Sequence, residues 1–294
     1  MSRIQLNRFD YFEPETVLEA VDILVKYKEE AKVIAGGIDL LPRMRTGSIK
    51  ANCLVSIGSI SDLSYFGYDD GTGLEFGAMT TLQFLDASAE LKEKYPALQK
   101  AIHQITSVQS KYMGTAVGNL CVATPGSDVA PALMAYDAEL LIAGPAGKRR
   151  EKLYDFYPAK GKTSLKRGEF VTGVHIPAPA KGTGAAFLNR VRTHADIARI
   201  TLTVFLGIEG EVCKEARIAM GAVAPTPVRA EKAEAMLKGQ KISEELFSEA
   251  SKAVVESMNP SSGLRSTKEY RTEVTPVLVE RALQKALEAA RRAV

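Results

Sequence analysis

Two glycine-bearing segments carry residue types that suit an anionic, phosphate-containing ligand. The first reads Ala35-Gly36-Gly37-Ile38-Asp39-Leu40, in which an apolar run enters two glycines that lead into the predicted start of a helix. Glycine lets a ligand approach the backbone, and free N–H groups at the start of a helix attract phosphate. The segment has neither the GxGxxG pattern of a dinucleotide-binding fold nor the Gly-Lys-Ser/Thr of a P-loop. Taken alone, a tight strand-to-helix turn remains the simpler interpretation.

The second segment, Gly114-Thr115-Ala116-Val117-Gly118-Asn119, continues to Thr124-Pro125-Gly126-Ser127-Asp128. It belongs to residues 113–131, which are rich in Gly, Thr, Ser, Asn and Pro and poor in charge, so we expect a long loop there. Successive N–H groups in such a loop can surround a pyrophosphate without a lysine. Asp128 can accept hydrogen bonds from ribityl or ribose hydroxyls, because a carboxylate is a strong acceptor. A plain surface loop, with Asp128 capping a helix near Pro131, remains open.

The other reactive side chains form no recognisable constellation. The three histidines have no partners at ligand or triad spacing, so we expect structural roles for His103, His175 and His194. The cysteines form no CxxC pair and no zinc spacing, and an iron–sulfur cluster needs four thiolates. The sequence therefore predicts no catalytic residue and no metal site in this chain. We interpret the cysteines as reduced thiols of a cytoplasmic protein: Cys53, Cys121 and Cys213.

The length of 294 residues corresponds to about two domains. Hydrophobic residues make up 46% and charged residues 25% of the chain, as in an average globular protein, which excludes disordered and collagen-like chains. The net charge of +3 is too small for a concentrated basic face, so no nucleic-acid partner is expected. The first ten residues lack the apolar core of a signal peptide, and no apolar run approaches the ~20 residues of a membrane span. We therefore expect a cytoplasmic protein with no membrane span.

Predicted strands and helices flank both glycine segments. Apolar spacing predicts helices at residues 14–25, 38–44, 82–92, 96–105 and 132–136, and strands at residues 31–35, 53–57, 74–78 and 139–143. The first of these elements form a βαβ-like unit in which the strand at 31–35 runs into Gly36. The Lys148-Arg149-Arg150 run follows a predicted turn, and we expect it to be a solvated loop.

A change of composition at Pro177 and Pro179 marks a domain edge over residues 176–184. Beyond it, residues 200–208 alternate between larger apolar side chains and residues such as Thr201 and Thr203, which predicts a strand. This strand and residues 215–222 flank a turn and are expected to form an antiparallel hairpin. Three helices are predicted to follow, at residues 229–238, 243–258 and 274–292, with Gly239 ending the first and Ser243 capping the second.

Ordered motifs along nearly the whole chain resemble one family, the FAD-binding medium subunits of the molybdenum hydroxylases, a group that includes xanthine dehydrogenases and carbon monoxide dehydrogenase. The Ala-Gly-Gly-x-Asp-Leu motif at residue 35 and the Thr-x-x-Gly-Asn…Ser-Asp…Pro-Ala-Leu motif from residue 115 are similar to its flavin-binding segments. Further similar stretches are LEFGAMTTL at residues 74–82, LKRGEFVTGVHIP at 165–177, RTHADIA at 192–198, MGAVAPTPVRAEKAE at 220–234 and YR at 270–271.

The resemblance implies an α+β fold with two domains. Residues 1–177 would form a FAD-binding domain of the p-cresol methylhydroxylase (PCMH) type, in which two α+β subdomains hold the flavin between them. Residues 178–294 would form the CO dehydrogenase flavoprotein-like C-terminal domain, with a small antiparallel sheet and a helical bundle.

The resemblance also implies which residues contact the cofactor. The first segment would wrap the FAD diphosphate through Val33, Ile34, Ala35, Gly36, Gly37, Ile38, Asp39 and Leu40. Thr115, Gly118 and Asn119 would form the second diphosphate segment, Asp128 would hold flavin-side hydroxyls, and Val171 would line the isoalloxazine pocket. Several positions depart from the family pattern. Ile38 stands where the family usually has Thr, Ser or His, Val117 where it usually has glycine, and Lys111-Tyr112 where it often has Arg-Asn.

The function implied by the resemblance is that of a FAD-binding electron-transfer subunit. A large partner subunit would carry the molybdenum cofactor, and a small partner subunit would carry [2Fe–2S] clusters. Electrons would reach FAD in this chain and leave to an acceptor, for which NAD is the commonest inference. Two alternatives remain open. One is a structural or assembly subunit without flavin, which Ile38 and Val117 motivate. The other is a free-standing FAD oxidoreductase, although the C-terminal half shows no paired acid and base.

Overall fold

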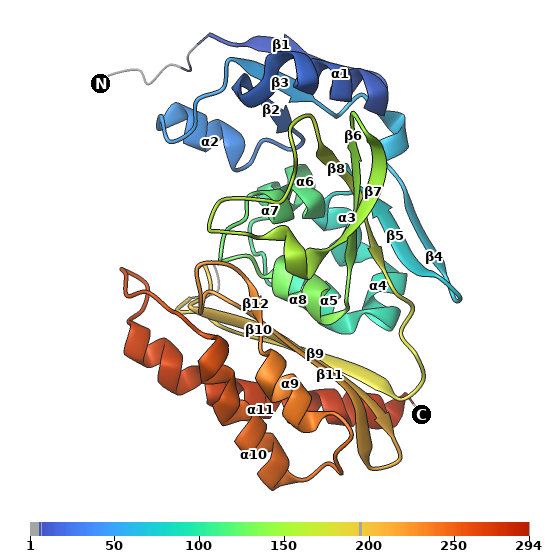
Figure 1. Ribbon diagram of the computed structural model, residues 1–294, viewed down its shortest axis with the longest axis vertical. Coiled ribbons are helices and arrows are strands. Elements are labelled where there is room, and N and C mark those ends of the chain that lie inside the picture. Colours follow the sequence, from blue (N-terminus) through green and yellow to red (C-terminus); the bar gives the residue numbers. More distant parts are fainter. Residues whose placement is uncertain (1–5, 7, 194–195, 294) are drawn as a thin grey trace.

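The computed structural model describes residues 6, 8–193 and 196–293. Three sheets lie one after another along its long axis (Figure 1): a small parallel sheet near the N-terminus, a five-stranded sheet with several helices, and a four-stranded sheet backed by the C-terminal helices. The α+β class predicted from the sequence is confirmed. In the part of the chain that the structure describes, no helix has both the length and the apolar composition needed to cross a bilayer.

The N-terminal subdomain is a parallel βαβ unit. Its elements are β1 (Asp10–Phe12), α1 (Val17–Tyr27), β2 (Ala31–Ile34), α2 (Leu40–Arg45) and β3 (Cys53–Ser56), with strand order β1-β3-β2. Helix α1 begins after Thr16, whose hydroxyl accepts a hydrogen bond from the N–H of Glu19. The predicted βαβ unit is confirmed. Strand β1 was missed, because three residues are too short to show an alternation.

The second subdomain is built on an antiparallel sheet of order β4-β5-β8-β6-β7. Its strands are β4 (Phe66–Asp69), β5 (Gly73–Gly77), β6 (Glu139–Gly144), β7 (Gly147–Lys152) and β8 (Phe170–Ile176). Its helices are α3 (Leu82–Ala87), α4 (Ala89–Lys94), α5 (Pro96–His103), α6 (Val108–Met113), α7 (Ala116–Cys121) and α8 (Val129–Ala135). The largest buried apolar cluster joins these elements to α1, β2 and β3. The two subdomains therefore share one core.

Three details of this region differ from the prediction. The helix expected at residues 82–92 is broken at Ser88, which ends α3 and caps α4 by accepting a hydrogen bond from the N–H of Leu91. Residues 113–131 are not one long loop, because Thr115 caps the short helix α7 inside them. The Lys148-Arg149-Arg150 run lies on β7 rather than in a loop, because it pairs with β6 in an antiparallel hairpin. The side chain of Arg149 is also held by the carboxylate of Glu169, with Nη2 2.8 Å from Oε2.

The C-terminal part consists of a four-stranded antiparallel sheet of order β12-β11-β10-β9 and three helices. Its elements are β9 (Thr183–Arg190), β10 (Ile200–Glu209), β11 (Val212–Gly221), β12 (Val228–Arg229), α9 (Glu231–Leu237), α10 (Glu244–Ala253) and α11 (Lys268–Arg292). Short 3₁₀ turns occur at Lys28–Glu30, Ser61–Leu63, Leu153–Phe156 and Val254–Ser257. The predicted hairpin of β10 and β11 is confirmed. Helix α11 starts six residues earlier than predicted, because Thr267 caps a polar first turn that has no apolar periodicity.

The sheet of the C-terminal part is covered on both faces. One face of β10, with Leu202 and Val204, packs in the apolar cluster shared with α9, α10 and α11. The other face, with Thr201, Thr203 and Phe205, is also fully or almost fully buried, because it packs beneath the second subdomain. The ring of Phe205 lies 5.9 Å from that of Tyr136, at the end of α8. The prediction of a domain boundary between residues 177 and 178 falls in the segment that joins β8 to β9 and stays a prediction.

Candidate functional site

The first glycine segment joins β2 to α2. Val33 and Ile34 end the strand, residues 35–39 form the turn, and Leu40 opens the helix. Gly37 has φ +68°, a conformation that glycine adopts without steric cost. Among the residues that the structure describes, the N–H groups of residues 35–39 donate to no protein acceptor. Adjacent free donors in a partly exposed turn are an arrangement that can bind an anion.

The side chains of this turn leave its donors accessible. The side chain of Ile38 is 40% exposed and is not part of the buried core. The carboxylate of Asp39 lies 2.9 Å from Nη1 of Arg43, one helical turn further along α2. The guanidinium partly neutralises the carboxylate, so that Asp39 repels an anion at the turn less than an unpaired aspartate would.

The two glycine segments touch each other through their backbones. A Cβ on Gly36 would lie 1.7 Å from the carbonyl oxygen of Met113 and 3.1 Å from the backbone nitrogen of Gly114, so only glycine permits this approach. The carbonyl of Gly114 accepts a hydrogen bond of 2.9 Å from the N–H of Leu82, at the start of α3. The part played by Met113 could not be predicted from the sequence. A backbone contact between distant segments leaves no signal in the residue type.

The second segment uses several of its donors internally. Oγ1 of Thr115 accepts a hydrogen bond from the N–H of Gly118 (2.9 Å), and the carbonyl of Thr115 accepts one from the N–H of Asn119 (3.0 Å). Oδ1 of Asn119 accepts a hydrogen bond from the hydroxyl of Ser127 (2.5 Å). The fold thus brings these residues beside the first segment, but the N–H groups of Gly118 and Asn119 serve helix α7. Their contact with a cofactor stays a prediction.

Asp128 carries the buried acceptor of this region. Its Oδ1 is buried and has no hydrogen-bond partner among the described residues. Burial raises the pKa of Asp128 to about 6, an effect that the hydroxyl of Thr201 on β10 partly offsets. Asp128 precedes α8 but makes no capping hydrogen bond. The hydroxyl of Ser127 accepts from the N–H of Ala130 instead. The alternative role of Asp128 as a helix cap is therefore wrong, and its Oδ1 remains without a hydrogen-bond partner among the described residues.

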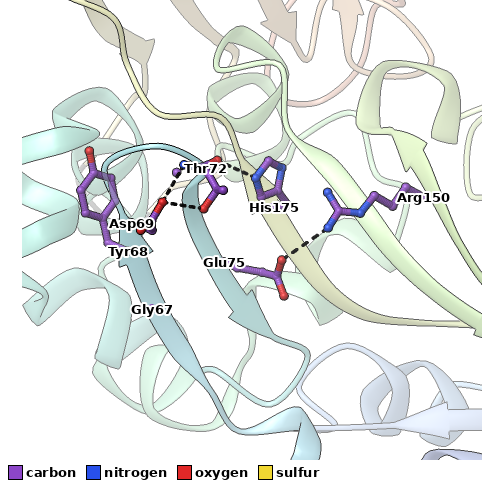
Figure 2. Close-up of a pocket in the computed structure, with 8 residues that line it drawn as sticks. Gly67, Tyr68, Asp69, Thr72, Glu75, Arg150 and His175 are labelled. Carbon is purple, nitrogen blue, oxygen red and sulfur yellow. Dashed lines mark hydrogen bonds and ion pairs between the residues drawn. The ribbon is translucent and has the colours of Figure 1, made fainter.

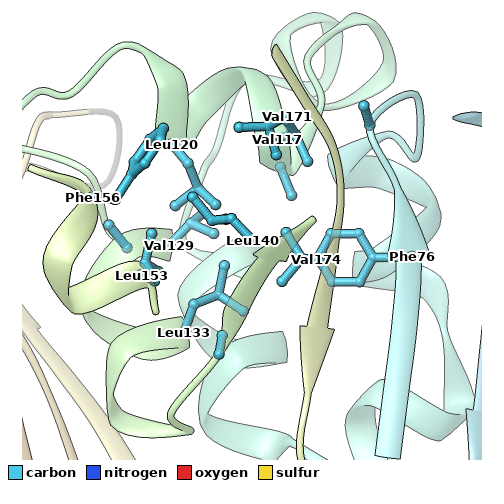
Figure 3. Packing of buried hydrophobic residues seen from close by; sticks show 14 of the residues in the cluster. Phe76, Val117, Leu120, Val129, Leu133, Leu140, Leu153, Phe156, Val171 and Val174 are labelled. Atoms are coloured by element: carbon cyan, nitrogen blue, oxygen red, sulfur yellow. The ribbon is translucent and has the colours of Figure 1, made fainter. Parts of the chain in front are cut away.

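The two valines singled out in the sequence both lie in the apolar core, and they are close together in Figure 3. Val117, on α7, is 5% exposed, and Val171, on β8, is 3% exposed. Because Val117 packs into the core, its Cβ does not crowd the outer side of the segment. Val171 is buried against other apolar side chains, so its proposed contact with an isoalloxazine ring stays a prediction.

A polar groove on the five-stranded sheet is lined by residues of β4, β5, β7 and β8 and of the turn between β4 and β5 (Figure 2), and it includes none of the predicted cofactor-binding residues. Arg150 lies 3.8 Å from a carboxylate oxygen of Glu75 and 3.5 Å from one of Glu139. The Nε2 atom of His175 lies 2.8 Å from the carbonyl oxygen of Thr72. These groups are already paired with one another, so we assign no ligand to the groove. Of the other histidines, His103 pairs with Asp86, and His194 lies outside the described residues.

The free cysteines are poor nucleophiles in this fold. Burial raises the pKa of Cys121 to about 12 and that of Cys213 to about 11, and Cys53 is fully buried. Each thiol is therefore protonated at neutral pH. Within the described residues, no group of three or more His, Cys, Asp or Glu side chains is arranged to hold a metal ion.

Two family models match the chain. One is described as the FAD-binding domain in molybdopterin dehydrogenase and matches residues 7–179. The other is described as the CO dehydrogenase flavoprotein C-terminal domain and matches residues 185–286. Together they span both of the regions described above.

Curated proteins and solved structures agree with these matches. The chain is 33% identical over 278 residues to the carbon monoxide dehydrogenase medium chain of Afipia carboxidovorans, covering 95% of this chain and 96% of the relative. It is 27% identical to the xanthine dehydrogenase FAD-binding subunit of Escherichia coli O157:H7, covering 95% and 96%. A chain of the carbon monoxide dehydrogenase from Hydrogenophaga pseudoflava superimposes with a TM-score of 0.93 at 32% identity, covering 97% of this chain and 99% of that one.

Proposed function

This chain belongs to the FAD-binding subunits of the molybdenum hydroxylases, and from that premise we propose that it passes electrons from a partner subunit to an external acceptor. Membership confirms the resemblance seen in the sequence and the two-domain α+β fold. It also confirms that the chain is a subunit of an oxidoreductase with FAD as its cofactor. In our proposal a small partner subunit supplies electrons from [2Fe–2S] clusters, and a large partner subunit oxidises the substrate at a molybdenum cofactor.

The residues of this chain fit a flavin dinucleotide. The free N–H groups of residues 35–39 can donate to diphosphate oxygens. The buried, unpartnered Oδ1 of Asp128 suits a hydroxyl of the ribityl or ribose part. Bound FAD would supply the redox chemistry, while the protein supplies binding, orientation and electrostatics. The contact of Gly36 with Met113, which places the free donors beside the second segment, is the observation that carries the proposal.

The departures from the family pattern leave this site open. Val117 replaces a glycine, but its side chain packs into the core. Ile38 replaces a hydroxyl-bearing or imidazole side chain, yet its backbone N–H makes no hydrogen bond with the rest of the described chain. Each departure removes at most a side-chain contact and leaves the backbone donors accessible. These observations favour the flavin-binding subunit over the flavin-free alternative.

We propose NAD as the electron acceptor, because flavins exchange hydride directly with nicotinamides. NADH added without oxygen should then bleach the flavin absorption of the purified chain. Unchanged absorption would exclude NAD and point to another acceptor. We place the complex in the cytoplasm, where three free thiols remain reduced.

The visible spectrum of the purified chain tests the proposal as a whole. We expect a yellow protein, or a colourless one that becomes yellow when FAD is added. No flavin absorption at saturating FAD would refute flavin binding and favour a structural or assembly subunit. Purification from the native host, followed by metal analysis, distinguishes the remaining alternative. Molybdenum and iron should co-purify with a partner-dependent subunit and be absent from a free-standing FAD oxidoreductase.

A further inference from the structure

Helix α6 has an inverted distribution of side chains. Its lysine, Lys111, is 8% exposed, whereas Val108 and Tyr112 are 57% and 63% exposed. A helix on a protein surface normally buries its apolar residues and exposes its charges. The burial of Lys111 therefore needs a specific partner inside the protein.

The partner of Lys111 is Asp86, the penultimate residue of α3. Nζ of Lys111 lies 2.5 Å from Oδ2 of Asp86, and both side chains are more than nine-tenths buried. The other carboxylate oxygen, Oδ1, lies 3.1 Å from Nε2 of Gln99 and 3.0 Å from Nδ1 of His103, both on α5. Each oxygen of the carboxylate is thus occupied, and the network ties α3, α5 and α6 together.

This network lies two residues before the contact between the glycine segments. Helix α6 ends at Met113, whose carbonyl oxygen occupies the place where Gly36 would carry a Cβ. The next residue, Gly114, is hydrogen-bonded to Leu82 at the start of α3. Since a helix rises about 1.5 Å per residue, a slip of α6 by one residue would take the carbonyl of Met113 off Gly36.

A buried ion pair is suited to fixing such a position. Its attraction is largely offset by the loss of hydration, so that apolar side chains of the same size often stabilise a fold as well. Its hydrogen bonds, however, are directional, whereas apolar packing allows sliding. The buried charge of Lys111 is therefore better explained by a role in positioning helix α6 than by a role in stability.

We propose that Lys111 and Asp86 are positioning residues for the flavin site. Their ion pair sets the place of Met113 and Gly114 against Gly36 and so presents the free N–H groups of residues 35–39 to the FAD diphosphate. The inference rests on the proposed flavin binding. Neither residue touches the cofactor in this account. They act through the backbone of the second segment.

The test compares Lys111→Met with Lys111→Arg in the full chain, and Lys92→Met on α4 is the control because Lys92 is exposed. The dissociation constant for FAD is measured by the change in flavin fluorescence. We expect Lys111→Met to weaken binding by about tenfold or more, which corresponds to about 1.4 kcal/mol. Lys111→Arg restores the charge and should bind within about threefold of wild type, as should the control.

Hydrogen exchange of the cofactor-free chain gives a second, independent readout. In Lys111→Met the amides of Leu82 and Gly114 should lose about tenfold or more in protection, while those of strand β10 stay unchanged. Wild-type FAD affinity with wild-type protection would overturn the inference. Equal losses in Lys111→Met and Lys111→Arg would overturn it too, because packing alone would then explain them.

Two further outcomes are also decisive. If Lys111→Met does not fold, Asp86→Asn replaces it with the same thresholds, because asparagine keeps the volume of the side chain and removes its charge. If wild-type protein binds no FAD, the proposed function fails, and hydrogen exchange at Leu82 and Gly114 still shows whether the ion pair positions the segment.

Discussion

The contact between the two glycine segments can be broken by one methyl group. In Gly36→Ala the new Cβ would be placed 1.7 Å from the carbonyl oxygen of Met113. An ordinary contact between carbon and a carbonyl oxygen is about 3.3 Å, so the two backbones would have to separate by about 1.6 Å. Gly36 does not have a positive φ, and the substitution therefore tests the contact and not the backbone conformation.

The substitution should lower both the stability of the cofactor-free chain and its affinity for FAD, and the two effects can be measured separately. Forcing an extra carbon into a packed contact costs about 1–3 kcal/mol, and a rigid backbone obstacle places this variant at the upper end. Moving the donors of residues 35–39 should also remove one or two charge-assisted hydrogen bonds to the diphosphate, each contributing about 1.5–3 kcal/mol. Loss of one such bond should weaken FAD binding about tenfold to hundredfold, and loss of two should weaken it about hundredfold to ten-thousandfold.

Urea denaturation of the cofactor-free chain measures the loss of stability, and titration with FAD measures the loss of affinity. The matched control is Gly67→Ala on β4, where an added Cβ has no heavy atom within 4 Å. The control should behave as wild type in both assays. If Gly36→Ala binds FAD like wild type and unfolds at the same urea concentration, the two segments are not held in contact as described, and the proposed site is wrong.

Three further predictions concern the cofactor and the junction between domains. Burial raises the pKa of Asp128 from 3.8 to about 6, so the stability of the folded chain should fall as pH rises between these values. Asp128→Asn should remove this fall and raise the melting temperature of the cofactor-free chain at pH 7.5. The same variant should weaken FAD binding by about tenfold. Thermal melts at pH 4 and 7.5 with FAD titrations check this, and unchanged FAD affinity would separate Asp128 from the site. Phe205→Ala should lower the free energy of unfolding, measured in urea, by about 3–5 kcal/mol, because the ring is buried against Tyr136. A loss below about 1 kcal/mol would mean that the stability of the two domains does not depend on this contact. FAD should be bound non-covalently, because burial raises the pKa of Cys121, the cysteine within the second segment, to about 12 and keeps the thiol protonated. Filtration under denaturing conditions should then release the colour, and retained colour would show a covalent bond.

Signals that depend on a few neighbouring residues were sufficient for most of the secondary structure. The alternation in residues 200–208 predicted β10, the glycine turn after residue 35 predicted the end of β2, and Ser243 was identified as a helix cap that accepts from the N–H of Leu246. These features were predictable because strand alternation, glycine turns and caps are decided within one or two turns of the chain.

The same local signals failed where a short element depends on its surroundings. Helix α7, six residues long, includes glycine and lies in a stretch that reads as a loop, and it is stabilised by burying Ala116, Val117 and Leu120. Tertiary packing overrides weak intrinsic propensity in such short helices. In β10, the alternation did not reveal that Thr201 and Thr203 are buried, because the covering face comes from another domain.

The sequence by itself determined the two glycine segments, Asp128 as a candidate acceptor and, through the order of the motifs, the family to which the chain belongs. Only the tertiary structure decided that Gly36 lies against the carbonyl of Met113, that Asp128 keeps an unpartnered buried oxygen, and that Lys111 turns inward to Asp86. The physical reason is that each of these contacts joins backbone or side-chain atoms far apart in the chain. Residue type and spacing encode the local conformation, whereas the meeting of distant segments is set by the packing of the whole core.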